Sequence, residues 1–233
     1  MIRSPIFIAF FLFIVACSNS YELETGEIRT FQVIKDSLEQ ASKQKQFVSA
    51  KKLISRNQID AANIPVLFIE LSSGQNGTLT PYPGKGVGQT WLGADGATVT
   101  LEKGILKASR GMGDDVMGGE IFIPPWAKIK KSAEYKRRIS FLNGNNQIQS
   151  KTFKCKMTKI DDRIIINIWT VDFEVVLYEE HCSGNRGEIK NEYYLDRSNI
   201  VRKSKQYHSE TVGYITIERL DRWLLAIFES VEI

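Results

Sequence analysis

Beyond Pro65 the chain is a series of short β-branched and aromatic runs separated by turn residues. Apolar and polar residues alternate within several runs, as in Phe153, Cys155 and Met157 against Lys154 and Lys156. Such alternation is typical of strands with one packed face and one wet face. Strands are therefore predicted over residues 66–71, 88–92, 98–102, 105–109, 138–142, 148–159, 163–169, 171–179, 189–195, 200–207 and 212–220.

The gaps between these runs are short and carry turn residues, so neighbouring strands are expected to pair antiparallel. The turn signals are Asp95-Gly96, Lys103-Gly104, Asn143-Gly144, Asp161-Asp162 and Ser183-Gly184-Asn185. Most gaps lack a helix-sized segment, which argues against a parallel α/β sheet. The fold class predicted is mainly β, an antiparallel meander sheet or open (half) barrel with N-terminal helical cover.

The helical cover is predicted before Pro65. Phe31, Ile34, Leu38 and Ala41 recur at steps of three and four residues, which indicates an amphipathic helix to about residue 45. More helix is expected over residues 49–56.

The N-terminus reads as an export signal. Residues 1–16 carry Arg3, an apolar run and a small residue before Cys17, and the run is about half the length needed to span a bilayer. Ile14-Val15-Ala16-Cys17 resembles the lipobox of bacterial lipoprotein precursors, in which the cysteine thiol is lipidated. The alternative is an ordinary signal peptide with a cysteine nearby.

These features predict a signal peptide over residues 1–16, a lipidated Cys17 with a tether to residue 29, and a single β-rich domain with N-terminal helices over residues 30–233. Attached acyl chains would hold the protein on a membrane without a spanning helix. In lipoproteins that this chain resembles, an Asp after the cysteine favours the inner membrane. Ser18 therefore indicates the outer membrane, with the domain facing the periplasm.

Two cysteines remain, Cys155 and Cys182, and export places them where disulfides persist. A bridge between them is predicted, with two free thiols as the alternative. Because the parity of Cys182 does not match the inward residues of its strand, the bridge is expected at a strand end or a bulge.

The net charge of +4 is too weak to imply nucleic acid, but the charge is unevenly placed. A basic cluster could meet an anionic polysaccharide or lipid phosphate, and its alternative is a solvated face. Its members are Lys128, Lys130, Lys131, Lys136, Arg137 and Arg138.

Catalytic signals are weak, so no enzyme activity and no cofactor are predicted. Glu179-Glu180-His181-Cys182 lacks the spacing of a metal site, and no serine stands in a G-x-S-x-G motif. The loop Gly111-Met112-Gly113-Asp114-Asp115 beside Arg110 could hold a ligand, or form a tight turn in which Arg110 neutralises one Asp. Asp114 and Asp115 are the only candidates for an enzyme acting on polysaccharide.

Two blocks of sequence carry a resemblance. The first runs from Thr90-Trp91-Leu92-Gly93-Ala94-Asp95-Gly96 to Gly111-Met112-Gly113-Asp114-Asp115, and the second from Asn191-Glu192-Tyr193-Tyr194-Leu195-Asp196 to Gly213-Tyr214-Ile215-Thr216-Ile217-Glu218. Together with the lipobox they resemble the YjbF/GfcB family of lipoproteins linked to capsule and exopolysaccharide production. The chain departs from the family pattern at two places. Ser198-Asn199 stands where the family usually has a turn glycine, and Arg202 stands where a tryptophan is common.

The resemblance implies an outer-membrane lipoprotein accessory to surface polysaccharide production or export, acting by binding glycan or a partner protein of the export machinery. The alternative is a periplasmic lipid or lipoprotein carrier with an apolar concavity. Trp91, Trp126 and Tyr82 are expected to be exposed aromatic residues. The possible ligand-binding residues are Trp91, Arg110, Asp114, Asp115, Lys130, Lys131 and Arg137.

Overall fold

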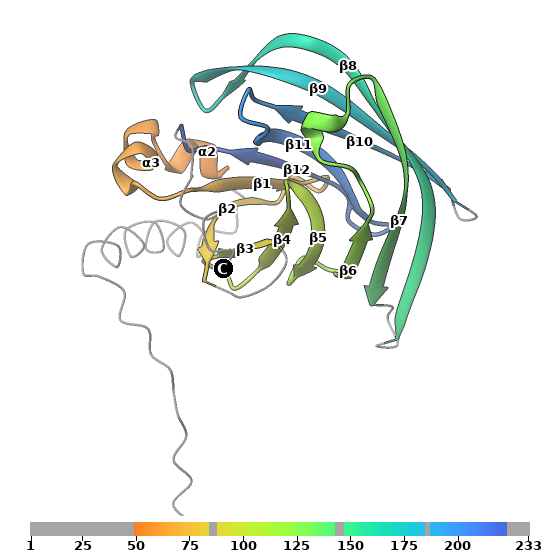
Figure 1. The fold of residues 1–233 in the computed structure, drawn as a ribbon. Coiled ribbons are helices and arrows are strands. Elements are labelled where there is room, and N and C mark those ends of the chain that lie inside the picture. The colour runs from red at the N-terminus through yellow and green to blue at the C-terminus, as the bar shows by residue number, and fades with distance from the viewer. Residues whose placement is uncertain (1–48, 84–87, 143–146, 185–186, 223–233) are drawn as a thin grey trace, which may run out of the picture.

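The computed structural model describes residues 49–83, 88–142, 147–184 and 187–222 (Figure 1). Over these residues the chain forms one sheet of twelve strands in the order β5-β4-β3-β2-β1-β12-β11-β10-β9-β8-β7-β6. The neighbouring strands are antiparallel. The sheet curls until its two edge strands, β5 and β6, lie side by side, so that it is nearly closed into a barrel.

The helices and strands have the following bounds. The helices are α2 (Ala50–Leu53), α3 (Arg56–Ala62) and the 3-10 turn η1 (Trp126–Lys128). The strands are β1 (Leu67–Leu71), β2 (Asn76–Tyr82), β3 (Gln89–Gly93), β4 (Thr98–Glu102), β5 (Ile105–Arg110), β6 (Val116–Ile121), β7 (Ser132–Leu142), β8 (Ile148–Ile168), β9 (Val171–Gly184), β10 (Gly187–Leu195), β11 (Val201–Ser209) and β12 (Gly213–Arg219).

The predicted fold class is confirmed: the chain is mainly β and antiparallel, with short helices near its N-terminal side. The helix expected over residues 49–56 is present as α2, and a second helix, α3, follows it. A capping box at Ser55 and Gln58 starts α3. The signal peptide, Cys17, the tether, the helix to residue 45 and the Asn143-Gly144 turn lie outside the described residues.

Two strands were missed and one predicted turn was wrong. Strands β2 and β6 were not predicted, because β2 contains Asn, Gly and Pro, and β6 contains Gly118 and Gly119, which are poor strand formers. Asp161-Asp162 is not a turn. Strand β8 runs through it, and the pairing with β9 shifts register between Lys159 and Ile164, so the predicted turn is a bulge.

Two hydrophobic clusters hold the sheet. The larger fills the inside of the barrel and takes buried side chains from every strand except β11. The smaller lies on the outer side of β1, where α2 and α3 pack with the tip of the β8–β9 hairpin. There Trp169 stacks edge-on against Phe68 at 5.5 Å and donates from Nε1 to the carbonyl oxygen of Ile54. The hairpin tip thereby fastens the helices to the sheet.

The predicted disulfide joins β8 to β9 inside the barrel. Cys155 and Cys182 are direct cross-strand partners with Cα atoms 4.0 Å apart. Opposite the bulge of β8, the inward-facing residues of β9 change from odd-numbered to even-numbered positions. Cys182 therefore faces inward although it does not continue the odd-numbered alternation that runs to Leu177. The bridge itself lies in regular register, two residues before the end of β9.

Replacing both cysteines, as Cys155→Ser/Cys182→Ser, is expected to lower the free energy of unfolding. The bridge closes a loop with a sequence separation of 27 residues, and the chain-entropy model gives roughly 3 to 4 kcal/mol for a loop of that size. Urea denaturation of the oxidised protein and of the variant measures the difference. Equal midpoints would show that the bridge contributes nothing.

Candidate functional site

Side chains close the barrel along the line between β5 and β6, which we call the seam. Gln206, on the inner face of β11, accepts from the amide of Leu106 and donates to the carbonyl of Gly104, both at 2.8 Å. This amide and this carbonyl lie on the edge of β5, where a neighbouring strand would normally form hydrogen bonds with them. A Cβ at Gly104 would lie 2.3 Å from a methyl of Val201, so only glycine allows this approach of β5 to β11.

The other end of the seam is held by a buried serine and histidine. Ser109 Oγ lies 2.8 Å from His208 Nε2, accepts from the amide of Val116 and donates to Asp115. Arg110 donates to the carbonyls of Ser109 and Val116, one on each side of the seam. Ser109 is 1 % exposed and all its hydrogen-bonding positions are used, so this pair is not a serine nucleophile with its base.

A buried carboxylate lies in the middle of the barrel. Glu180 accepts hydrogen bonds from Tyr135 at 2.5 Å, Arg137 at 2.7 Å, Asn191 at 2.5 Å and Tyr193 at 3.0 Å. Glu180 is fully buried and Arg137 is 1 % exposed. We call these five residues the Glu180 cluster. Such a set stabilises only when every member is paired, because an unpaired buried charge is costly.

The pKa values agree with a structural role for the Glu180 cluster. Burial, and then the adjacent Glu180 carboxylate, raise the pKa of Tyr135 well above its ordinary value of 10.0. Burial opposes the charge of Arg137, but Glu180 outweighs it and raises the pKa of the guanidinium. The tyrosines therefore stay protonated and the arginine charged at any physiological pH. The two tyrosines and Arg137 therefore do not exchange a proton near neutrality.

The Glu180 cluster is also an unsuitable metal site. Cys155 Sγ, Cys182 Sγ and a Glu180 oxygen lie within 4.8 Å of one another. Both sulfur atoms are joined in the disulfide and therefore are not thiolate ligands. The Glu180 oxygens are already taken by the side-chain donors.

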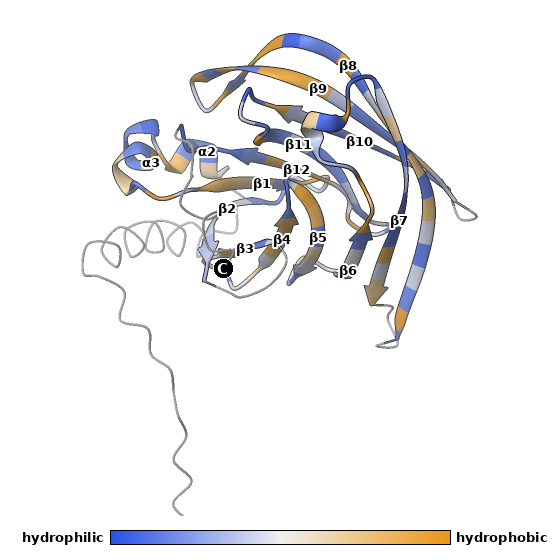
Figure 2. Cartoon of the chain, in the orientation of Figure 1, coloured by the Kyte–Doolittle hydropathy of each residue, from blue (hydrophilic) through white to orange (hydrophobic). Residues whose placement is uncertain are grey.

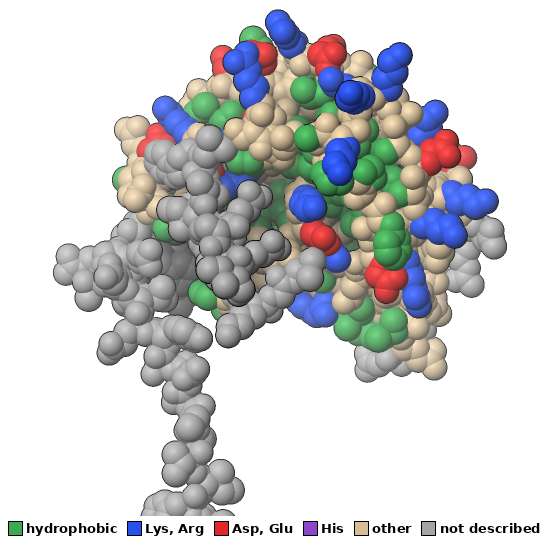
Figure 3. Space-filling model, in the orientation of Figure 1, with side chains coloured by type: hydrophobic (Ala, Val, Ile, Leu, Met, Phe, Trp, Pro, Cys, Tyr) green, Lys and Arg blue, Asp and Glu red, His purple; other side chains and the backbone are tan. Residues whose placement is uncertain are grey.

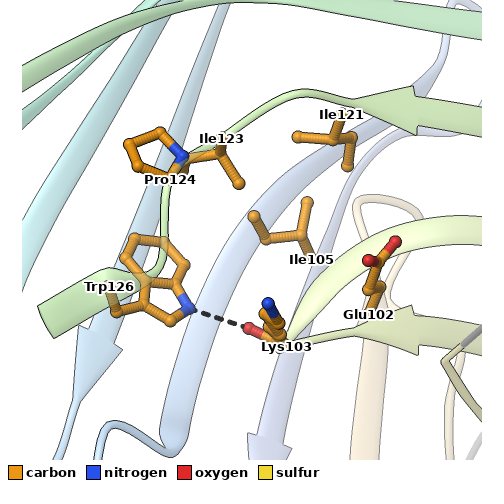
Figure 4. Close-up of a pocket in the computed structure, with 7 residues that line it drawn as sticks. All are labelled: Glu102, Lys103, Ile105, Ile121, Ile123, Pro124 and Trp126. Carbon is orange, nitrogen blue, oxygen red and sulfur yellow. Dashed lines mark hydrogen bonds between the residues drawn. The ribbon is translucent and has the colours of Figure 1, made fainter. Parts of the chain in front are cut away.

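Residues 123–131, which we call the plug, connect β6 to β7 and turn the buried side chains of Trp126 and Ile129 into the barrel. Trp126 packs between Tyr178 and Tyr193, with ring centroids 5.4 Å from each, and donates from Nε1 to the carbonyl of Lys103. Beside it is a pocket of about 30 Å³, lined by Glu102, Lys103, Ile105, Ile121, Ile123, Pro124 and Trp126 (Figure 4). That volume suits one or two water molecules, not an acyl chain or a sugar.

The structure places the sequence-predicted aromatic residues differently from expectation. Trp91 and Trp126 are each 5 % exposed and lie in the core, so the prediction of two exposed tryptophans was wrong. Trp91 alternates with outward Thr90 and Leu92 on β3 and therefore faces inward. Tyr82 is exposed as expected, at 51 %.

The glycine-rich loop is a tight turn held by its own aspartate. Asp115 accepts from the amides of Gly111 and Met112 as well as from Ser109. Asp114 is exposed and accepts from Thr211. Arg110 bonds carbonyl oxygens, so the expected neutralisation of an Asp by Arg110 was wrong. The two carboxylates serve the loop and do not face each other across a cleft.

The predicted basic cluster is divided by the alternation of β7. Arg137 points inward to Glu180, so its assignment to a surface patch was wrong. Its neighbours Lys136 and Arg138 point outward and are exposed. Lys130 and Lys131 are exposed on the end of the plug, before β7 begins.

The outer face of β7 to β10 carries a group of cations that sequence reasoning only partly found. Lys136 lies directly opposite Lys154 of β8, and Lys156 follows two residues later on the same face. His181 then lies between Lys156 and Lys190 of β10. We call this group the basic band; its members are Lys136, Arg138, Lys154, Lys156 and Lys190, all exposed.

Figures 2 and 3 show how polar and charged residues are distributed along β7 and β8. Hydrophobic and hydrophilic residues alternate along β8 in Figure 2. Phe153, Cys155 and Met157 face the core, and Lys154 and Lys156 between them face outward. Lysine and arginine side chains project from the rim over β7 and β8 in Figure 3. The lysines at positions 154 and 156 were visible in the sequence as the wet face of a strand, but only strand pairing shows that they meet Lys136.

A family model described as group 4 capsule polysaccharide lipoprotein GfcB, YjbF matches residues 33–220. A solved structure, the hypothetical lipoprotein YmcC from Escherichia coli (K12), matches with a TM-score of 0.67 and 18% sequence identity. That match covers 82% of this chain and 97% of the other. It shows that the two proteins share a fold. No curated protein matches the sequence.

Truncating Arg137 is expected to destabilise the protein strongly, because Glu180 would remain buried without its cation. The expected loss for Arg137→Ala is about 3 to 5 kcal/mol. Arg138→Ala is the matched control, since it removes the same charge one residue away on the outer face, where the effect should stay within about 0.5 kcal/mol. Equal losses in the two variants, measured by urea denaturation, would contradict the buried role of Arg137.

Stability is also expected to fall as the pH is lowered through His208's ordinary pKa. Burial lowers the pKa of His208 below 6.5, although Asp115 and Asp114 oppose the shift. Below pH 6.5 the unfolded chain then binds a proton that the folded protein resists, so unfolding becomes easier. His208→Asn should flatten this part of the stability profile between pH 7.5 and 5.5. An unchanged slope would exclude His208 as its source.

Proposed function

Because the chain belongs to the family described as group 4 capsule polysaccharide lipoproteins, we propose that it is an outer-membrane lipoprotein accessory to surface polysaccharide production or export. It acts by binding glycan or a partner protein of the export machinery, with the domain facing the periplasm. The observation that carries the proposal is the family match, which spans residues 33–220.

The lipid on Cys17 is the proposed anchor. The chain has the apolar leader and the lipobox-like Ile14-Val15-Ala16-Cys17 that lipidation requires. Among the described residues, no helix combines the length and apolar character needed to cross a bilayer. Two or more acyl chains on one cysteine hold a protein firmly on a membrane. Ser18, in place of an aspartate, supports the outer membrane as the destination.

We propose binding and not catalysis because the buried polar side chains that the structure describes are engaged in structural hydrogen bonds. The buried serine, histidine and carboxylates hold one another or the backbone. The described interior is packed by the larger hydrophobic cluster, to which Trp126 of the plug belongs, and by the Glu180 cluster. This filling also weighs against the lipid-carrier alternative, which needs an apolar concavity.

Deleting the gene should reduce the amount or change the chain length of the surface polysaccharide, and restoring the wild-type gene should reverse the change. A Ser18→Asp variant tests the location, since it keeps lipidation but favours the inner membrane, and it should fail to restore the polysaccharide. Ser18→Ala is the matched control and should restore it. Polysaccharide of unchanged amount and length in the deletion strain would refute the proposed function.

A further inference from the structure

We propose that the basic band binds a single chain of an acidic polysaccharide, one whose sugars carry carboxylate or phosphate groups. This inference rests on the proposed function and adds to it the binding surface and the chemical class of the ligand.

Like charges lie close together in the basic band. Lys136 and Lys154 are direct partners across an antiparallel pair, where facing side chains of like charge repel and destabilise the sheet. Lys154 and Lys156 are also neighbours on one face of β8. A fold that optimised stability alone would place an acid at one of these positions. An anionic ligand relieves this repulsion.

Three lysines at the centre of the basic band, Lys136, Lys154 and Lys156, have no acidic partner within the described part of the chain. Some cations elsewhere on the surface have partners, as Lys159 has Asp162 and Arg197 has Glu174, whereas others, such as Lys130 and Lys131, also form no salt bridge with a described residue. The basic band therefore presents charge that is free to meet a ligand.

The cations of the basic band are regularly spaced. Neighbouring strands lie about 4.8 Å apart, and residues two apart on a strand are about 6.8 Å apart. The band thus offers cations every ~5 to 7 Å across β7 and β8. A linear polymer with repeated anionic groups can contact several at once, which multiplies weak single contacts. Exposed Phe122, whose amide bonds the carbonyl of Lys136, adds an apolar ring at the edge of the band.

The surroundings favour a polymer chain over a membrane surface. Glu120 lies opposite Arg138, Glu134 opposite Lys156, and Glu188 opposite Ser183, so acids border the basic band. A flat anionic bilayer would have to approach these carboxylates together with the lysines. A single chain can follow Lys136 and Lys154 between them.

The test uses the mature lipoprotein in neutral detergent micelles, with alginate oligosaccharides as a polyuronate probe and dextran of equal length as a neutral probe. Calorimetry should show alginate binding that weakens with added salt, and no dextran binding. Lys136→Gln/Lys154→Gln should weaken alginate binding about tenfold. Lys52→Gln/Lys103→Gln removes two exposed charges elsewhere and should leave the affinity unchanged. Absent alginate binding, equal dextran binding, or equal losses in both double variants would overturn the proposal.

Two further measurements separate ligand binding from a structural or membrane role. Lys154→Glu should raise the melting temperature, because it replaces the repulsion between Lys136 and Lys154 with attraction. The same variant should abolish alginate binding. A lower melting temperature would show that the two lysines do not repel each other. Alginate should shield Lys154 from acetylation, and adding phosphatidylglycerol to the micelles should not. Shielding by the phospholipid and not by alginate would overturn the proposal in favour of a membrane surface.

The two proposals fail in different ways. If deleting the gene reduces the polysaccharide but the lipoprotein does not bind alginate, the ligand inference fails and the proposed function stands. If the deletion leaves the polysaccharide unchanged, the proposed function fails whatever the calorimetry shows.

Discussion

The barrel depends on how its open edge is satisfied. A sheet whose first and last strands do not form a ladder leaves backbone donors and acceptors without partners, and inside a protein these are costly. Gln206 satisfies two of these backbone groups, because its side-chain amide accepts one hydrogen bond and donates another, as the peptide group of a neighbouring strand would. Ser109 and Arg110 do the same at the other end of the seam. The buried polar side chains at the seam follow from this requirement.

Once polar side chains occupy the interior, they require one another. Tyr193 connects the two sets, because its hydroxyl lies within hydrogen-bonding distance of both Glu180 and Gln206. Trp126 covers Tyr193 and bonds the turn that begins β5. The buried charge, the plug and the seam are therefore parts of one structural network. Among the described residues of this network, the buried side-chain atoms without a hydrogen-bond partner are Arg137 Nε and His208 Nδ1. The remaining polar groups hold one another or the backbone, and the ligand is therefore proposed to bind on the outer surface.

Much of the fold was predictable from the sequence and much of the site was not. Alternating residues identified the central strands, since burial of one face leaves a period of two. Strands β2 and β6 were missed because their stability comes from pairing with neighbours and not from their glycine- and proline-containing sequences. The direction of Arg137 was missed because a run of basic residues hides the alternation that an apolar strand displays. The facing of Lys136 and Lys154 depends on a register between two strands, which no local pattern contains.

The central claim is that the interior is structural and that ligand binds outside, on the basic band. Hydroxyl-radical footprinting of the mature lipoprotein with and without an acidic polysaccharide tests it most directly, because the two candidate places carry different aromatic reporters. Phe122 is 69 % exposed beside the basic band, whereas Trp126 is 5 % exposed in the plug. The account predicts that polysaccharide protects Phe122 and leaves Trp126 unreactive throughout. A change in the reactivity of Trp126, with Phe122 unaffected, would contradict it.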